Sequence, residues 1–123
     1  MERWFAILGS AFAFLAVALG AFGAHALRER LDPRDLEIFE VGVRYQMYHA
    51  LALLAIAVLL GRWAGSLGVW AGWAFVLGIL VFSGSLYLLV GTGARAWGAV
   101  TPLGGVAFLL GWVLLVAHLM RIP

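Results

Sequence analysis

The sequence contains no cysteine, no lysine, and no acidic residue after Glu40. The absence of cysteine excludes disulfides, thiol redox chemistry, cysteine-bound zinc and iron–sulfur clusters. Charged residues make up only 11% of the chain, whereas they make up about a quarter of an ordinary soluble domain. The long apolar stretches contain no carboxylate of the kind that proton-coupled carriers use, which argues against such a carrier.

Apolar side chains dominate instead: they account for 65% of the 123 residues, and the mean hydropathy is +1.05. A domain of this length has too little interior to hide so many apolar side chains from water. A lipid bilayer is the environment that covers them. The arginines stand singly between the apolar stretches, as membrane-flanking residues do, so the net charge of +2 does not indicate a nucleic-acid binder. The composition also argues against a soluble enzyme and a disordered protein.

Four apolar stretches have the length of transmembrane helices. About 20 residues cross the roughly 30 Å of hydrocarbon, and each stretch must be helical because lipid offers its backbone no hydrogen-bond partner. The sequence therefore predicts an all-α fold, an antiparallel four-helix transmembrane bundle with an amphipathic interfacial helix between helices 1 and 2, in a single domain over residues 1–123. The helices are predicted at about residues 4–27, 33–61, 67–91 and 102–120.

The predicted second helix has a clear start signal. Asp32 is suited to the N-cap, and Pro33 occupies the first helical position. Residues 33–44 then carry apolar side chains on one face, and Glu40 and Arg44 have the spacing of a helical ion pair. This amphipathic segment either lies on the membrane surface or runs directly into the second transmembrane helix.

Small residues recur at helical spacing within three of the four stretches. Such stripes let helix backbones approach closely, either inside the bundle or between copies of the chain. We predict packing inside the bundle, because four helices already offer one another faces. The stripes are Ala16, Gly20 and Ala24; Gly68 and Gly72; and Gly104, Gly111 and His118.

Polar side chains gather at one end of the predicted bundle, the end opposite both termini, which we call side B. In a membrane bundle such side chains face the interior or a watery cavity, because exposure to lipid is costly. His25 and His49 fall at similar predicted depths on adjacent antiparallel helices, so their rings can meet across the bundle. His118 lies near the opposite end. The candidate ligand-binding residues at side B are His25, Gln46, His49, Ser83, Tyr87 and Thr101.

Three interpretations of the paired histidines remain open. The rings can be structural, they can line a pocket for a lipid headgroup, a quinone or another small amphiphile, or they can bind a metal ion or haem. Two histidines suffice as the axial ligands of haem but make a poor zinc site without a further ligand. A nucleophilic Ser83 or Ser85 with a histidine base lacks an orienting acid, so no catalytic residue is predicted.

The arginines also predict an orientation. Side B carries five of them and the opposite end three. By the positive-inside rule, the side-B loops at residues 28–44 and 92–101 are cytoplasmic and both termini lie outside.

Several short motifs, taken together and in this order, resemble one family. The chain is similar to the YgdD-like small multi-pass membrane proteins, the family known as domain of unknown function 423. The resemblance covers nearly the whole chain and implies a four-helix, multi-pass plasma membrane protein, but it implies no activity. The motifs are Gly20-Ala-Phe-Gly-Ala-His-Ala-Leu27, Tyr45-Gln-Met-Tyr-His-Ala-Leu-Ala-Leu-Leu54, Phe82-Ser-Gly-Ser-Leu-Tyr87, Thr101-Pro-Leu-Gly-Gly105 and Gly111-Trp112.

These observations predict a non-enzymatic, multi-pass protein of the cell (inner) membrane, without a cofactor or bound metal. It is expected to bind a small amphiphile, a lipid or a quinone, or else a partner helix, at the side-B cluster. One alternative is a redox-linked membrane protein in which His25 and His49 ligate haem or a metal ion. The other alternative is a small homo-oligomeric channel or transporter.

Overall fold

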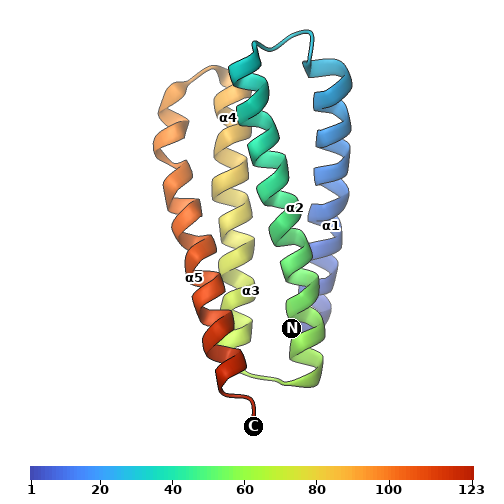
Figure 1. Ribbon diagram of the computed structural model, residues 1–123, viewed down its shortest axis with the longest axis vertical. Coiled ribbons are helices and arrows are strands. Elements are labelled where there is room, and N and C mark those ends of the chain that lie inside the picture. Colours follow the sequence, from blue (N-terminus) through green and yellow to red (C-terminus); the bar gives the residue numbers. More distant parts are fainter.

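The computed structural model describes residues 1–123 and contains four antiparallel rods, each long and apolar enough to cross a membrane. The chain runs up and down along them, so both termini lie at the same end (Figure 1). The third rod is continuous from Ser66 to Thr92 and contains a π-helical turn in its middle. The elements are α1 (Glu2–Phe22) with a π-helical turn (Gly23–Leu27), α2 (Pro33–Arg62), α3 (Ser66–Gly78), the π-helical turn (Ile79–Ser83), α4 (Gly84–Thr92), a 3₁₀ turn (Arg95–Ala99) and α5 (Thr101–Met120).

The N-terminus of α2 forms as its sequence predicts. The Asp32 side chain accepts a hydrogen bond of 2.8 Å from the backbone N–H of Asp35, and Pro33 occupies the first turn. The amphipathic residues 33–44 are continuous with the rest of α2 and stand beside α1, rather than forming a separate helix. The expected ion pair between Glu40 and Arg44 is not formed.

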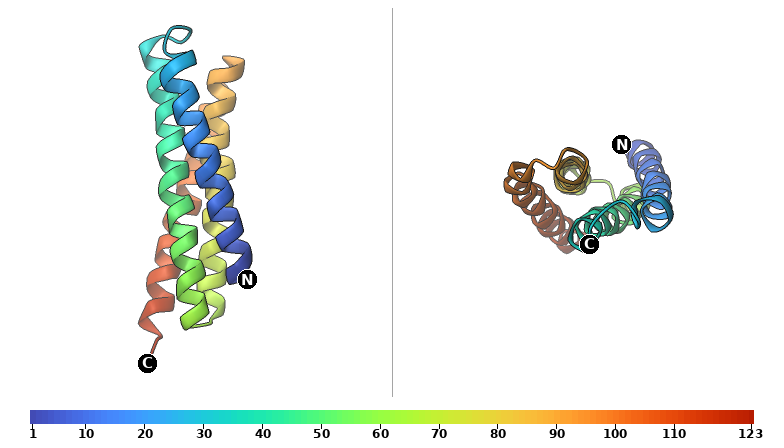
Figure 2. Two further views of the ribbon diagram at one scale, coloured as in Figure 1. Left: turned by 90° about the vertical axis from the view of Figure 1, so that its right-hand side faces the viewer. Right: turned by 90° about the horizontal axis from the view of Figure 1, so that it is seen from above.

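The rods do not contact one another equally. α1 packs mainly against α2, and α5 packs mainly against α3 and the π-helical turn that follows it. Seen from above, α1 and α5 lie at opposite ends of the arrangement, with α2 and α3 between them (Figure 2). Phe5, Leu53, Ile56 and Phe75 are completely buried at the centre. The outer face of α1 is largely exposed, which in a bilayer is contact with lipid.

The close contact of α5 with the third rod depends on glycines. A side chain at Gly104 would meet the backbone of Phe82, and a Cβ at Gly111 would lie 2.6 Å from the ring of Phe75. This confirms that the small-residue stripe of α5 serves packing inside the bundle. Near the C-terminal end of α5 the glycine is on the other helix: the His118 ring of α5 lies against Gly68 of α3.

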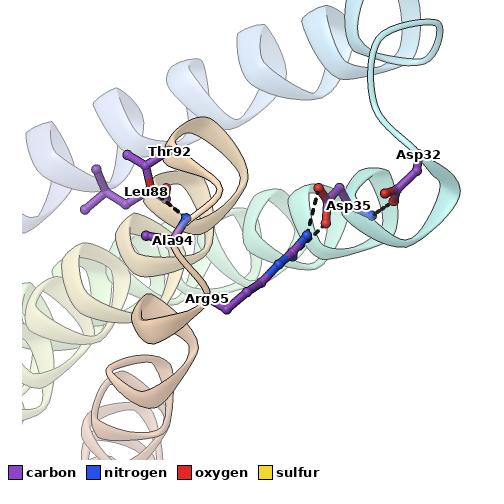
Figure 3. Close-up of polar contacts among 6 residues, drawn as sticks. All are labelled: Asp32, Asp35, Leu88, Thr92, Ala94 and Arg95. Carbon is purple, nitrogen blue, oxygen red and sulfur yellow. Dashed lines mark hydrogen bonds and ion pairs between the residues drawn. The ribbon is translucent and has the colours of Figure 1, made fainter.

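An ion pair joins the turn before α5 to the start of α2. The Arg95 guanidinium donates to both carboxylate oxygens of Asp35, at 2.8 and 3.3 Å. Figure 3 shows the Arg95 side chain reaching from the turn to the first turn of α2. The contact joins residues 60 positions apart in the chain, and it lies at side B.

Candidate functional site

Three of the six candidate residues meet inside the bundle, where they connect three rods. The Gln46 side chain donates to the carbonyl oxygen of Phe12 at 2.9 Å and accepts from the Tyr87 hydroxyl at 2.7 Å. The Ser83 hydroxyl donates to the carbonyl oxygen of Gly42 at 2.6 Å. Gln46 and Ser83 are almost fully buried. These bonds connect α2 to α1 on one side and to the third rod on the other.

Thr101 belongs to a separate contact between the third rod and α5. Its hydroxyl lies 2.6 Å from the Ser85 hydroxyl and also donates to the carbonyl oxygen of Trp97 at 3.3 Å. Ser83 and Ser85 therefore bond in different directions, the first to α2 and the second to α5. Neither hydroxyl is bonded to a histidine, so the geometry offers no activated serine.

His49 is fixed in one orientation by bonds at both ring nitrogens. Nδ1 lies 2.8 Å from the carbonyl oxygen of Tyr45, and Nε2 accepts from the Trp112 indole N–H at 3.1 Å. A carbonyl only accepts and an indole N–H only donates, so these partners select the neutral ring with its hydrogen on Nδ1. The ring also stacks on Phe108, with centroids 3.6 Å apart and planes 9° apart. His49 is thus a bridge between α2 and α5.

Trp112 is the residue of the site that the sequence analysis misses. It appears there only in a motif, yet it is the hydrogen-bond partner of His49 and packs against Phe75. The available signal was the indole N–H itself, because a membrane-buried donor requires an acceptor. With three histidines and many carbonyls to choose from, the sequence did not identify which acceptor it was.

The expected meeting of His25 and His49 is wrong. Gly23 lies against the Phe39 ring, whereas Gly9 lies against Ala50, and these contacts define the register of α1 on α2. His49 is ten residues beyond Phe39 in α2, a rise of about 15 Å. His25 lies beyond Gly23 in the opposite direction and is exposed. The two rings are therefore at different depths.

This placement bears on the haem and metal alternative. One iron atom between His25 and His49 requires both rings at one depth, with a free nitrogen on each. The two rings are separated, and both nitrogens of His49 are already bonded within the protein. No three side chains of the usual metal-ligating types lie close together. The buried polar atoms all have partners, which is the arrangement expected of residues that stabilise the bundle.

A groove of about 400 Å³ lies beside the His49–Trp112 bridge, between α2 and α5, and we call it the aromatic groove. Rings form much of its wall: Tyr45 and Phe82 have centroids 4.8 Å apart, and Phe82 and Phe108 have centroids 5.4 Å apart. The Tyr45 hydroxyl has no partner in the protein. The groove is lined by Tyr45, His49, Phe82, Pro102, Gly105, Val106, Phe108, Leu109 and Trp112.

A second groove lies on the other side of α5, between α5 and α3, and we call it the α3-side groove. Its volume is about 410 Å³, nearly that of the aromatic groove. Every residue in its wall is hydrophobic, and none of them makes a side-chain hydrogen bond. It is lined by Trp70, Trp73, Ala74, Leu77, Ala107, Leu110 and Leu114.

Comparison with known proteins places the chain among small membrane proteins. Residues 19–105 match the family model described as "Protein of unknown function (DUF423)". The UPF0382 membrane protein YwdK of Bacillus subtilis is 49% identical over 118 residues, which is 95% of this chain and 96% of that protein. A UPF0382 membrane protein of Staphylococcus saprophyticus is 47% identical over 118 residues, which is 96% of this chain and 98% of that protein. No solved structure matches the chain.

Proposed function

Because this chain belongs to the DUF423 family of membrane proteins, whose function is unknown, we propose its function from the aromatic groove. The protein is a non-enzymatic, multi-pass protein of the cell (inner) membrane that binds a small amphiphile in this groove. The ligand carries a flat polar ring on an apolar tail, the chemistry of a quinone. The observation that carries the proposal is a ring-lined groove whose wall includes Tyr45, a residue with a hydroxyl that has no partner in the protein.

The shape and composition of the wall favour a flat ring over a plain acyl chain. Tyr45, Phe82 and Phe108 surround one part of the groove, with their rings tilted by about 30–52° to one another. Aromatic faces of this kind pair with a flat ring in offset or edge-to-face geometry, which adds about 0.5–1.5 kcal/mol to the burial of apolar area. An acyl chain gains only the burial.

The Tyr45 hydroxyl supplies the polar contact. It lies outside the hydrogen bonds of the buried network and outside the His49–Trp112 bridge. A phenol is a good donor to a ring carbonyl, and in lipid this bond replaces one that water would otherwise provide. His49 acts as a positioning residue, because its two bonds hold the Tyr45 segment and the Trp112 indole on opposite walls.

The groove opens toward lipid, so a ligand enters it from within the bilayer. Val106 and Leu109 line the groove and are 62% and 68% exposed. Pro102 and Thr101, at the start of α5, mark the side-B end of the groove. A ligand with a tail therefore lies along α5 with its ring near Tyr45, at the depth of the buried polar network.

The test uses a glycine substitution that fills the groove, with a matched control. Gly105 lines the groove and has room for a larger side chain, since a Cβ there lies 4.0 Å from Phe82. Gly84 has nothing within 4 Å of its Cβ position and does not line the groove, so Gly84→Leu is the control for Gly105→Leu. Both variants are purified in mild detergent and titrated with a benzoquinone carrying a short alkyl tail, with tryptophan fluorescence as the readout.

We expect Gly105→Leu to weaken quinone binding by about tenfold or more, because the leucine occupies the space of the ring. Gly84→Leu should bind as the unaltered protein does. Equal affinity of the two variants would contradict the proposal. If an alcohol with the same tail competes as well as the quinone, the groove accepts a chain rather than a ring. If a second helix co-purifies in the groove and excludes the probe, its occupant is a protein.

A further inference from the structure

We propose a second binding site, for the headgroup of an aminophospholipid such as phosphatidylethanolamine, in the groove between α1 and α2. Arg44 binds the phosphate and Glu40 binds the ammonium group. This site is separate from the aromatic groove, which lies on the α5 side of α2.

The groove has a volume of about 310 Å³ and lies where α1 lacks a side chain. A Cβ at Gly20 would point toward the Val43 side chain, at 3.4 Å, so the glycine leaves space between the two helices. Phe39 is buried beside this space and gives it an apolar wall. Glu40 and Arg44 complete the lining, so the site combines a cleft with one charge of each sign.

Neither charge has a partner within the protein. The only side-chain ion pair is the one between Asp35 and Arg95, and the spacing of Glu40 and Arg44 does not produce a second. Both side chains are exposed at the edge of the groove. An unpaired guanidinium and an unpaired carboxylate at one cleft form the complement of a zwitterion.

The depths of the two residues match the headgroup region. Measured from Arg62, at the other end of α2, Arg44 is 18 residues away and Glu40 is 22 residues away. These separations correspond to rises of about 27 and 33 Å, and the hydrocarbon is about 30 Å thick. With Arg62 at one boundary of the hydrocarbon, Arg44 lies at the other boundary and Glu40 lies outside it.

The order of the charges discriminates between headgroups. In an aminophospholipid the phosphate is attached to the glycerol, so it lies nearer the hydrocarbon, and the amine extends beyond it. Arg44 is the deeper residue and Glu40 the outer one, so each meets its opposite charge. A headgroup with a phosphate and no amine offers Glu40 no opposite charge. A choline group offers the carboxylate no N–H donor.

The experiment compares three lipids with identical acyl chains: phosphatidylethanolamine, phosphatidylcholine and phosphatidylglycerol. The full chain is reconstituted in equimolar mixtures of the three and released for native mass spectrometry, which counts each retained lipid. We expect phosphatidylethanolamine to be retained about tenfold over the other two, as for one extra charge-assisted hydrogen bond. Equal retention of the three lipids would overturn the proposal.

Two substitutions separate the roles of the charges. Glu40→Gln should shift retention from phosphatidylethanolamine to phosphatidylglycerol. Arg44→Gln should abolish the preferential retention of either lipid. The double exchange Glu40→Arg with Arg44→Glu keeps the net charge but inverts the order, so it should also lose the preference. Glu37→Gln and Arg34→Gln are the controls, because both residues are exposed on α2 and neither lines the groove.

The outcomes distinguish this site from a general attraction of charges. If Glu37→Gln changes the lipid ratios as Glu40→Gln does, or if the inverted pair keeps the preference, the headgroup does not bind in this cleft. Gly105→Leu should leave the lipid ratios unchanged, so failure of the quinone proposal and failure of this one are recognised separately.

Discussion

The two grooves beside α5 have nearly the same volume but are built differently. On the α3 side, glycines bring the backbones into contact, and the groove that remains has only apolar walls. On the α2 side, α5 is held mainly through side chains, and the His49–Trp112 hydrogen bond connects the two helices. Volume alone therefore does not identify a binding site in a membrane protein, because lipid tails fill any apolar crevice. The aromatic groove differs from the other one in that Tyr45, Phe82 and Phe108 pack ring against ring in its wall and in that Tyr45 carries a hydroxyl.

The largest effect should come from disrupting the close contact between α5 and the third rod, which borders both grooves. Gly104→Val places a side chain against the backbone of Phe82, which cannot move aside without displacing the whole helix. We expect the free energy of unfolding to fall by about 3 kcal/mol or more, because the clash is with backbone rather than with a flexible side chain. Denaturant titration in mixed micelles, followed by circular dichroism, measures this change.

Gly84→Val is the matched control for Gly104→Val. Nothing lies within 4 Å of the Cβ position of Gly84, so the same substitution should change the unfolding free energy little. Similar losses at both glycines would mean that valine itself, rather than the contact between α5 and the third rod, destabilises the bundle.

Each groove beside α5 is lined by a tryptophan that can be replaced by phenylalanine, Trp112 in one and Trp70 in the other. Trp112→Phe removes the indole N–H and leaves Nε2 of His49 without its donor, whereas Trp70→Phe removes an N–H that has no partner. The first variant should lose about 1 kcal/mol of unfolding free energy, within the range measured for buried hydrogen bonds. The second should be close to neutral. Equal losses in the same denaturant titration would show that the hydrogen bond adds nothing to the free energy of unfolding.

Tyr45→Phe should affect binding without affecting folding. The hydroxyl bonds to no protein group, so the unfolding free energy should stay unchanged. Affinity for the quinone probe should fall about three- to tenfold, the value of one hydrogen bond. A parallel quinone titration of Trp70→Phe, in the α3-side groove, should show no change. If Tyr45→Phe binds as tightly as the unaltered protein, the ring carbonyl has no partner at this position.

The sequence predicted the parts of this comparison that depend on local chemistry. Apolar length gave the four rods, and Asp32 with Pro33 gave the start of α2. The inward clustering of Gln46, Ser83 and Tyr87 followed from the cost of exposing polar groups to lipid. The single-domain boundary at residues 1–123 and the orientation in the membrane stay predictions.

The parts that failed depend on register and on long-range fit. Residues 33–44 continue α2 beside α1, so α1 carries His25 past Phe39 and away from the depth of His49. That register is decided by how Gly9 and Gly23 fit against α2, which no spacing within one helix reveals. The choice of Trp112 as the partner of His49 depends likewise on how two distant helices face each other.

The smallest effect should come from the ion pair that joins the turn before α5 to α2. Arg95 is more than half exposed while Asp35 is largely covered, so water screens the pair only in part. Arg95→Gln should lower the free energy of unfolding, measured by the same denaturant titration, by about 0.5 kcal/mol or less at low salt. At high salt the loss should almost vanish, because exposed ion pairs are weak and screened. Arg34→Gln, on the same turn of α2, should show no such salt dependence. The pair spans only the α2 side of α5, so Arg95→Gln should also weaken quinone binding slightly and leave the α3-side groove unaffected. A loss of unfolding free energy that persists unchanged at high salt would mean that Arg95 stabilises the contact by packing of its side chain rather than by its charge.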